Sequence, residues 1–342
     1  MTPLLNRQIV LASRPSGMPT DTNFRIVKAE LPRDPGSGVV LRTLWLSLDP
    51  YMRGKMNEGK SYTQPVQIGE VMDGGTVSQV ISSRVDGLEP GDFVVGYTGW
   101  QEYAHVDGKS HRKLDPGTAP LSTALGILGM PGMTAYTGLL NIGRPKSGET
   151  LVVAAASGAV GSVVGQIGKI KGCRVVGIAG GSAKVAYVKD ELGFDDAIDH
   201  HAPDFADRLS RACPKGIDIY FENVGGRVWE GVFPLLNNFA RIPVCGLIAN
   251  YNMTELPVGR DHVPELMRAV LSKRLAIQGF IVGDFASQAA DFQRDVGGWF
   301  REGRLKYREH IIDGLENAPA ALIGMLKGEN FGKLLIKVAD PQ

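Results

Sequence analysis

The chain has 342 residues, of which 43% are hydrophobic, and its formal net charge is +1. This length predicts two domains, and the near-neutral charge argues against electrostatic binding to nucleic acid or to an anionic membrane. The three cysteines, Cys173, Cys213 and Cys245, lie far apart and lack metal-binding spacing. An odd, low count of this kind predicts a reducing compartment and no disulfide framework.

The sequence gives no indication of membrane targeting. Asn6, Arg7 and Arg14 interrupt the apolar core that a signal peptide would need. The uncharged stretch Leu121–Gly143 is long enough to cross a bilayer, but it contains Pro131 and several glycines. We therefore expect buried helix and turns in this stretch, and a soluble, cytoplasmic protein.

The first third of the chain is rich in predicted strands. Short apolar runs separated by turn residues lie at 38–41, 44–48, 74–77 and 92–97. Their spacing predicts a small, irregular barrel. Between them, Leu48–Gly54 is expected to be a loop that contains an aromatic ring, a thioether and a cation. Loops often have a function, although a purely structural turn is the alternative interpretation here.

A βαβ unit is predicted between Leu151 and Gly181. It follows Gly129–Tyr136, which is expected to begin a helix. The apolar run 151–156 is typical of a strand buried on both faces of a parallel sheet. Val160, Val163, Val164 and Ile167 recur at helical spacing, and the β-rich run 174–179 follows. Strand, helix and strand together predict half of a dinucleotide-binding fold.

The turn between this strand and this helix consists of small residues, SGAVG at 157–161. Such a turn allows backbone N–H groups at a helix start to approach a pyrophosphate. We therefore expect Gly158, Ala159, Val160 and Gly161 to bind a dinucleotide. The first glycine of the G-x-G-x-x-G pattern is replaced by Ala156. A tight turn that binds nothing is the alternative interpretation.

The second strand of the unit is followed by GGSAK at 180–184. Enzymes selective for NAD usually have an acid about 20 residues after the first glycine, where it binds the ribose 2′-hydroxyl. No acid stands between Arg174 and Lys189. This indicates NADPH as the cofactor, with Lys184 as the partner of the 2′-phosphate; a solvated helix face is the alternative for Lys184.

Strands and helices continue to alternate to the end of the chain. Candidate strands lie at 197–199, 217–221, 241–245, 277–282 and 331–337, and candidate helices at 202–211 and 263–273. The alternation predicts a doubly wound parallel sheet, in which ligands bind beyond the carboxyl ends of the strands. Residues 222–226, 246–252 and the segment after Gly279 are therefore expected at the cofactor.

The chemistry predicted from these residues needs no metal. The histidines do not form H-E-x-x-H, and no cysteine lies within a few residues of another. Reduction of a C=C bond conjugated to a carbonyl then becomes the simplest reaction to explain, because one or two hydrogen-bond donors can stabilise the enolate. A tyrosine hydroxyl, with a pKa of about 10, can also supply the proton. Tyr251, after a predicted strand end, is the first candidate and Tyr51 the second; packing at a domain interface is the alternative for both.

The sequence contains five motifs, LDPYMRG (48–54), GMPGMTAY (129–136), AASGAVGSVVGQ (155–166), FENVGG (221–226) and NFGK (330–333). Together they resemble the zinc-independent medium-chain dehydrogenase/reductases of the leukotriene B4 12-hydroxydehydrogenase and prostaglandin reductase family, and most closely its bacterial, NADPH-dependent curcumin reductases. The resemblance implies a GroES-like β-barrel domain over 1–128, a Rossmann domain over 129–302 and a C-terminal segment, 303–342, that returns to the first domain. It also implies a homodimer.

The resemblance further implies which residues contact NADPH. Besides the glycine turn and Lys184, they are His200, Asn223, Cys245, Gly246, Tyr251, Phe280, Ile281, Val282 and Asn330. The family often has tyrosine where this chain has His200, beside the adenosine phosphate. An imidazole there suggests that NADPH affinity falls as the pH rises through its pKa.

The implied activity is NADPH-dependent reduction of the C=C bond of α,β-unsaturated ketones and aldehydes. Hydride adds to the β-carbon and the enolate is then protonated. Two alternatives remain open: a zinc-free quinone reductase on the same fold, and a redox-sensing protein that binds NADPH without turnover.

Overall fold

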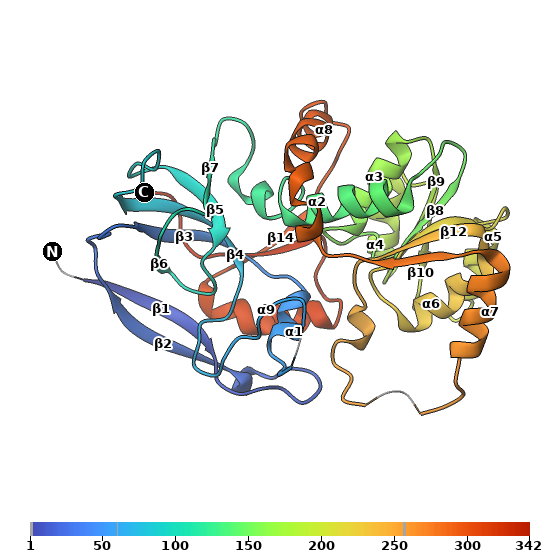
Figure 1. Ribbon diagram of the computed structural model, residues 1–342, viewed down its shortest axis with the longest axis horizontal. Coiled ribbons are helices and arrows are strands. Elements are labelled where there is room, and N and C mark those ends of the chain that lie inside the picture. The colour runs from blue at the N-terminus through green and yellow to red at the C-terminus, as the bar shows by residue number, and fades with distance from the viewer. Residues whose placement is uncertain (1–2, 60, 256–257) are drawn as a thin grey trace. The chain divides into compact units, whose positions relative to one another are not determined.

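The computed structural model describes residues 3–59, 61–255 and 258–342, which form two compact units (Figure 1). Unit 1 combines Met1–Gly126 with Glu309–Gln342, and unit 2 is Ile127–Arg308. The sequence predicts divisions after residues 128 and 302. Residues 303–308 belong to unit 2, where Lys306 N donates to Gln166 Oε1 (2.7 Å) and its carbonyl accepts from Gln166 Nε2 (2.9 Å).

Unit 1 is built around a seven-stranded sheet with the order β14-β15-β3-β4-β5-β7, in which β6 also pairs with β3. The strands are β3 (Val39–Ser47), β4 (Gly75–Ser83), β5 (Phe93–Tyr97), β6 (Tyr103–Val106), β7 (Arg112–Leu114), β14 (Glu309–Asp313) and β15 (Lys333–Lys337). β15 lies antiparallel to β3, with Leu335 opposite Ser47. The C-terminal segment therefore completes a sheet that the N-terminal residues begin.

A separate hairpin and several short helices complete unit 1. β1 (Leu4–Leu11) and β2 (Phe24–Leu31) pair antiparallel. The helices are η1 (Asp21–Asn23), α1 (Tyr51–Lys55), η2 (Leu121–Leu125), η8 (Leu315–Asn317) and α9 (Ala318–Leu326). The fully buried Trp100 stacks on Phe24, with ring centroids 5.7 Å apart, so that the hairpin shares the apolar interior of the unit.

Two predictions in unit 1 need correction. Leu48–Gly54 is not wholly a loop, because Tyr51 begins α1. Pro50 already has helical angles (φ −59°, ψ −29°), and Met52 N donates to the Asp49 carbonyl, which together nucleate the turn. The runs 38–41 and 44–48 belong largely to one strand, β3, because the polar residues between them also pair in the ladder.

No helix among the described residues is long and apolar enough to cross a membrane. The uncharged stretch that raised this possibility forms η2, α2 (Met130–Thr137) and η3 (Gly138–Gly143). The prediction that Gly129–Tyr136 begins a helix is confirmed, with Gly129 as its N-cap.

Unit 2 contains a parallel sheet of six strands in the order β10-β9-β8-β11-β12-β13. They are β8 (Thr150–Val153), β9 (Arg174–Ala179), β10 (Asp196–Asp199), β11 (Ile217–Phe221), β12 (Leu236–Val244) and β13 (Ala276–Gly279). In chain order this is 3-2-1-4-5-6, the arrangement of dinucleotide-binding folds. The order reverses between β8 and β11, and the predicted doubly wound sheet is confirmed.

Helices cover both faces of this sheet (Figure 1). They are α2, η3, α3 (Gly161–Ile170), α4 (Ser182–Ala186), η4 (Tyr187–Glu191), α5 (Phe205–Ala212), α6 (Gly226–Val232), η5 (Phe233–Leu235), η6 (Ile248–Asn250), α7 (Val263–Lys273), η7 (Val282–Gln288) and α8 (Ala289–Arg301). α2 packs between α3 and α8, and α5 packs on α6. Apolar residues of β8 to β12 and of α5 and α6 form a buried core.

One predicted strand of unit 2 ends early. The sequence predicts a single strand over 277–282, but β13 ends at Gly279 and Val282 begins η7. The Phe280 ring turns into the core against Phe221, and Ile281 N donates to Asp284 Oδ2 (3.1 Å). Both interactions turn the chain away from the sheet.

Candidate functional site

The predicted glycine turn lies at the carboxyl end of β8, where the strand order reverses. Ala155 has a φ of +50°, and Gly158 N donates to the Ala155 carbonyl (2.9 Å). A Cβ atom on Gly161 would lie 2.3 Å from the same carbonyl oxygen, so only glycine fits this close approach of helix to strand. Gly158, Ala159 and Val160 are partly exposed at the start of α3, as binding a pyrophosphate at a helix N-terminus requires.

Asn223 reaches this turn from the neighbouring strand. It follows β11 by two residues, and its Nδ2 donates to the Ala154 carbonyl (2.8 Å). The bond joins the carboxyl ends of β8 and β11. The structure thus brings two of the predicted site segments together at the switch point of the sheet.

Glu222, which lies in the predicted cofactor segment 222–226 without an assigned role, organises the same edge. Its side chain is buried, and Oε1 accepts hydrogen bonds from Tyr220 Oη (2.8 Å), Val224 N (2.7 Å) and Gly225 N (2.9 Å). Burial raises the pKa of this carboxyl, while the backbone N–H donors lower it. An acid directly after a buried strand was the available signal.

Cys245, Gly246 and Tyr251 lie in the loop after β12. Cys245 N (2.9 Å) and Gly246 N (3.2 Å) both donate to the Glu222 backbone carbonyl. Leu247 N donates to Tyr251 Oη (3.3 Å), so the tyrosine folds back onto its own loop. Burial raises the pKa of Tyr251 and raises that of Cys245 to about 12, which keeps both groups protonated near neutral pH.

Two imidazoles meet at the carboxyl end of β9. The rings of His200 and His201 lie 4.1 Å apart, and a Cβ atom on Gly180 would lie within 3.0 Å of both Nε2 atoms. Burial and then the neighbouring His201 lower the pKa of His200. Lys184, in α4, is half-buried, and burial lowers its pKa. The predicted phosphate subsite therefore has two titratable rings, with the cations Lys184 and Arg227 both acting on His200.

A carboxylate also lies beside the two imidazoles. Asp199 comes from β10 rather than from the segment after β9, and its Oδ1 accepts from His201 N (2.9 Å). Burial alone would raise the pKa of Asp199. Hydrogen bonds from the backbone N–H groups of Gly181 and His201 lower it by more, so the pKa lies below its usual value and the carboxyl is ionised near neutral pH. Asp199 is distant in sequence from the segment after β9, and only the pairing of β9 with β10 in the sheet brings the two close together.

The three residues at 280–282, which are predicted to contact NADPH, differ in how far their side chains are exposed. Phe280 is buried, and its ring would collide with a Cβ atom on Gly138, so its side chain packs in the core. Ile281 is 37% exposed and Val282 begins η7. Only Ile281 of these three presents a substantially exposed apolar side chain.

Tyr51 and Asn330 lie in unit 1, apart in sequence from the remaining predicted site residues. The Tyr51 hydroxyl is buried without a hydrogen-bond partner among the described residues, and burial and Asp49 raise its pKa well above the usual value. Asn330 Nδ2 donates to the Gly332 carbonyl (2.9 Å). Lys333 then donates to Asp49 Oδ1 (2.8 Å) and to the Leu48 carbonyl (2.8 Å), which joins the LDPYMRG and NFGK motifs through a buried ion pair.

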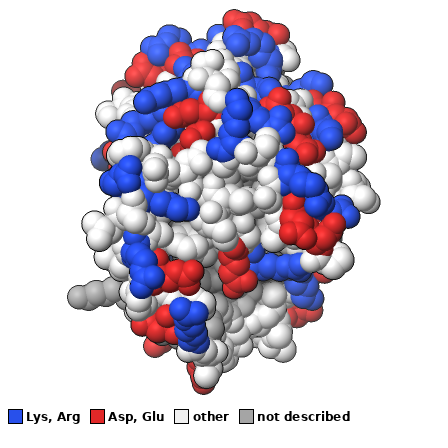
Figure 2. All heavy atoms as spheres, turned by 90° about the vertical axis from the view of Figure 1, so that its right-hand side faces the viewer, with Lys and Arg blue, Asp and Glu red and all other residues white. Residues whose placement is uncertain are grey.

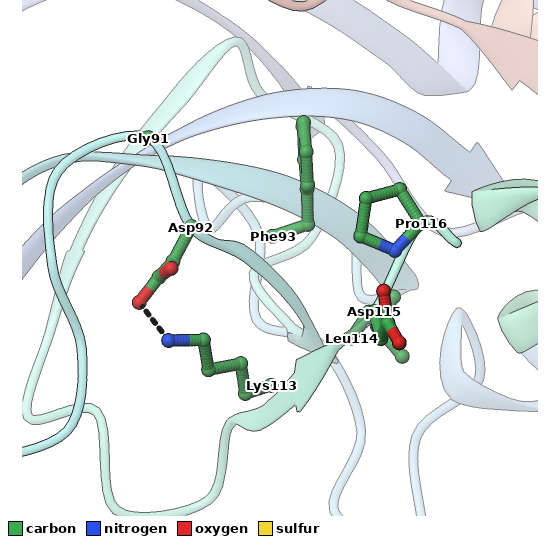
Figure 3. Close-up of a pocket in the computed structure, with 7 residues that line it drawn as sticks. All are labelled: Gly91, Asp92, Phe93, Lys113, Leu114, Asp115 and Pro116. Carbon is green, nitrogen blue, oxygen red and sulfur yellow. Dashed lines mark ion pairs between the residues drawn. The ribbon is translucent and has the colours of Figure 1, made fainter. Parts of the chain in front are cut away.

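A surface hollow elsewhere in unit 1 contains none of the predicted site residues (Figure 3). Residues at the start of β5 and in and after β7 line it, and Lys113 Nζ lies 2.6 Å from Asp92 Oδ2 across it. The charges of Lys113 and Asp92 thus neutralise each other, and we assign no role to the hollow.

Two family models match the chain. One, described as the N-terminal domain of oxidoreductase, matches residues 7–114, and the other, described as zinc-binding dehydrogenase, matches residues 159–297. Within the described ranges, no three His, Cys, Asp or Glu side chains come together in a way that could hold a metal ion.

Relatives of known name match nearly the whole chain. The NADPH-dependent curcumin reductase of Escherichia coli is 57% identical over 336 residues, covering 98% of this chain and 97% of that protein. Prostaglandin reductase 1 of Rattus norvegicus is 43% identical over 329 residues, covering 94% and 95%. The structure of CurA from Vibrio vulnificus in complex with NADPH superposes with a TM-score of 0.95 at 55% identity, covering 98% of this chain and all of that one.

These matches confirm the resemblance that the five motifs indicated, and the two units have the sheet architecture that it implied. The chain belongs to the medium-chain dehydrogenase/reductase family, in the group of oxidoreductases that includes NADPH-dependent curcumin reductase and prostaglandin reductase 1.

Proposed function

We propose that this protein reduces the C=C bond of α,β-unsaturated ketones and aldehydes with NADPH. The observation that supports this most strongly is the clustering of the glycine turn, Asn223 and the Tyr251 loop at the switch point of the six-stranded sheet. The relatives are named NADPH-dependent curcumin reductase, prostaglandin reductase 1 and, in Nicotiana tabacum, 2-alkenal reductase. Their names agree with the cofactor and the substrate class that the sequence predicts.

The residues of the glycine turn fit a dinucleotide, and bound NADPH would supply the hydride. The backbone N–H groups at the start of α3 would bind its pyrophosphate, and Lys184 would pair with its 2′-phosphate. The Tyr251 hydroxyl, kept protonated by its raised pKa, donates a hydrogen bond to the carbonyl oxygen of the enone. As charge develops on that oxygen, the same hydroxyl stabilises the enolate and provides the proton.

A screen of NADPH oxidation over enals, enones, curcumin-like dienones and quinones tests this proposal. We expect turnover of the conjugated carbonyl compounds with a saturated carbonyl product. Turnover confined to quinones would instead favour a quinone reductase. NADPH binding without oxidation across the panel would favour a redox-sensing protein.

Replacing Lys184 tests the phosphate subsite. Lys184→Ala removes a cation that would pair with the 2′-phosphate, a bond to a charged group worth about 1.5–3 kcal/mol, or about 10- to 100-fold in affinity. We expect KM for NADPH to rise by this factor and KM for NADH to change little. Steady-state kinetics with both cofactors measure the difference, and equal changes would place Lys184 outside the subsite.

The imidazole pair predicts a pH-dependent affinity for NADPH. His200 is surrounded by His201, Asp199, Arg227 and Lys184, and its pKa in the free protein is lowered, first by burial. A bound phosphate dianion would raise this pKa, so binding takes up a proton. His200 thus has a lower pKa in the free protein than in the complex. The affinity for NADPH is highest below the lower of the two pKa values and falls until the pH exceeds the higher one.

We expect the Kd for NADPH to increase by about tenfold between about pH 5.5 and pH 8, because one unit of pKa difference corresponds to one factor of ten. Fluorescence titration of NADPH measures this. His200→Gln is the matched control, since the phosphate titrates equally with both proteins. A ratio of the two Kd values that stays constant over this range would rule out His200.

We also propose that the reaction needs no zinc and that the protein is cytoplasmic. The enolate mechanism requires only the tyrosine donor, and Cys173, Cys213 and Cys245 are free thiols, as suits a reducing compartment. Dialysis against a chelator should leave activity unchanged. Loss of activity that zinc restores would contradict this proposal.

We further propose a homodimer formed through the β13 edge of unit 2. β13 is the last strand of its sheet, and all four of its residues are exposed. In the helix that precedes it, α7, the apolar residues Val263, Met267 and Leu271 recur every four residues and are 58–79% exposed. Figure 2 views the side on which α7 lies and shows an uncharged area bordered by charged side chains. An open strand edge with an apolar border favours pairing with a second copy.

Light scattering after size exclusion should give a mass twice that of the chain. The double variant Met267→Glu/Leu271→Glu should give the mass of one chain, because charges on the stripe oppose its burial. Ile68→Glu, at an exposed apolar residue of unit 1, is the matched control and should remain dimeric. A monomeric wild-type protein would refute the proposal.

A further inference from the structure

Glu222 is the residue on which two loops at the candidate site depend. Its carboxylate accepts the N–H groups of Val224 and Gly225, within the loop after β11. Its backbone carbonyl accepts the N–H groups of Cys245 and Gly246, within the loop after β12. The carboxylate itself fixes the loop that contains Asn223. That loop in turn binds the loop that contains Tyr251, because the Asn223 and Val224 carbonyls accept from Ile248 N (3.3 Å) and Ala249 N (3.0 Å).

The carboxylate is buried without a cation. Glu222 is 2% exposed, and no Lys or Arg forms an ion pair with it in the part of the chain that the structure describes. Its partners are instead two backbone N–H groups and the hydroxyl of Tyr220, which is itself buried against Trp229. Burying an unpaired carboxylate is unfavourable, and an apolar side chain would fill the space at lower cost. The presence of an acid at position 222 is therefore explained by the loop geometry that its hydrogen bonds impose, and not by a gain in the stability of the fold.

We propose that Glu222 is a positioning residue for the reductase reaction, whose carboxylate holds the loop after β11 in the shape that places Asn223 on the Ala154 carbonyl and supports the adjoining Tyr251 loop. This inference rests on the proposed function, which assigns cofactor and substrate to these loops. A charged acceptor suits the role, because hydrogen bonds to a carboxylate are about twice as strong as those to a neutral oxygen. Three donors that converge on one oxygen atom also define the direction of the turn.

The test compares two substitutions of Glu222 with one of Glu149. Glu149 is a half-buried acid of unit 2 that directly precedes β8, at the opposite end of the strand from the glycine turn. Its Oε1 accepts from Arg241 Nη1 (2.9 Å), so it is paired with a cation. Glu222→Gln keeps an acceptor oxygen and removes the charge. Glu222→Ala removes the acceptor, and Glu149→Gln is the control for a general loss of stability.

Two readouts separate positioning from stability. Amide hydrogen exchange of Val224 and Gly225, measured on the protein without any enone, should become at least about tenfold faster in Glu222→Ala and less so in Glu222→Gln. The kcat/KM for an enone should fall by about 100-fold in Glu222→Ala, the size expected when reacting groups shift by about 1 Å, with kcat and KM for NADPH both affected. Glu149→Gln should lower the unfolding temperature and leave both readouts unchanged.

The inference is overturned if Glu222→Ala, at a temperature where it is folded, matches Glu149→Gln in amide exchange and in kcat/KM. If Glu222→Ala does not fold, the same comparison with Glu222→Gln decides, and equality with Glu149→Gln overturns the inference. A wild-type protein that reduces no enone would refute the proposed function instead, and the exchange of Val224 and Gly225 together with NADPH affinity would still test the role of Glu222.

Discussion

Tyr251→Phe should lower kcat for enone reduction by about 10- to 1,000-fold, the range in which general-acid and oxyanion donors contribute. The ring remains and packs as before, so the change isolates the hydroxyl. The only hydrogen bond described for this hydroxyl is the one it accepts from Leu247 N, which leaves its own proton available for a substrate oxygen. Steady-state kinetics at saturating NADPH measure the effect.

Tyr51→Phe distinguishes the two candidate donors. Its hydroxyl has no partner among the described residues, so its proton is also available. Because Tyr251 lies in the same unit as the glycine turn and Asn223, and Tyr51 does not, we expect loss of the Tyr51 hydroxyl to change kcat far less. Tyr187→Phe, a buried tyrosine of η4 in unit 2, controls for removal of a hydroxyl as such. A wild-type kcat in Tyr251→Phe together with a large loss in Tyr51→Phe would reverse the assignment. Wild-type values in both would leave the cofactor ribose or water as the proton donor.

Lys333→Met should destabilise the protein by about 3–5 kcal/mol, because it leaves the Asp49 carboxylate buried without its cation. The Lys333 and Asp49 residues are 4% and 6% exposed, and after the substitution the one remaining side-chain partner described for Asp49 is the Ser47 hydroxyl. Urea unfolding measures the free energy. The effect is large because Lys333 in β15 donates hydrogen bonds to the segment between β3 and α1. One cation therefore links the C-terminal segment to the N-terminal part of unit 1.

The double variant Asp49→Leu/Lys333→Met should recover most of this loss, since apolar replacement of a buried pair is often nearly neutral. Lys113→Met removes the cation of an exposed pair with Asp92 and should change the unfolding free energy little. A Lys333→Met protein as stable as wild type would show that the buried pair does not hold β15 to the β3–α1 segment.

The sequence predicted best those elements whose pattern is local. β9 and α7 have the bounds that apolar runs and helical periodicity indicated, and the glycine turn lies between strand and helix as expected. β9 is a continuously buried apolar run, and the half-buried residues of α7, Leu266, Ala269, Val270 and Lys273, recur at helical spacing, so neighbouring residues determine both elements.

The interactions that the sequence did not predict join distant residues. Asp49 and Lys333 are 284 positions apart. Asp199 lies at the end of a different strand from Lys184, and only the adjacency of β9 and β10 brings its carboxylate to Gly181. The five-residue helix α1 is likewise too short for a periodic signal and depends on its surroundings.

The most direct test of the account is product analysis with NADPH that carries deuterium at the transferred position. With an enone substrate we expect a saturated ketone with one deuterium on the β-carbon, and an unlabelled proton from solvent on the α-carbon. Deuterium on the carbonyl carbon of an allylic alcohol, or reduction limited to quinones, would contradict it.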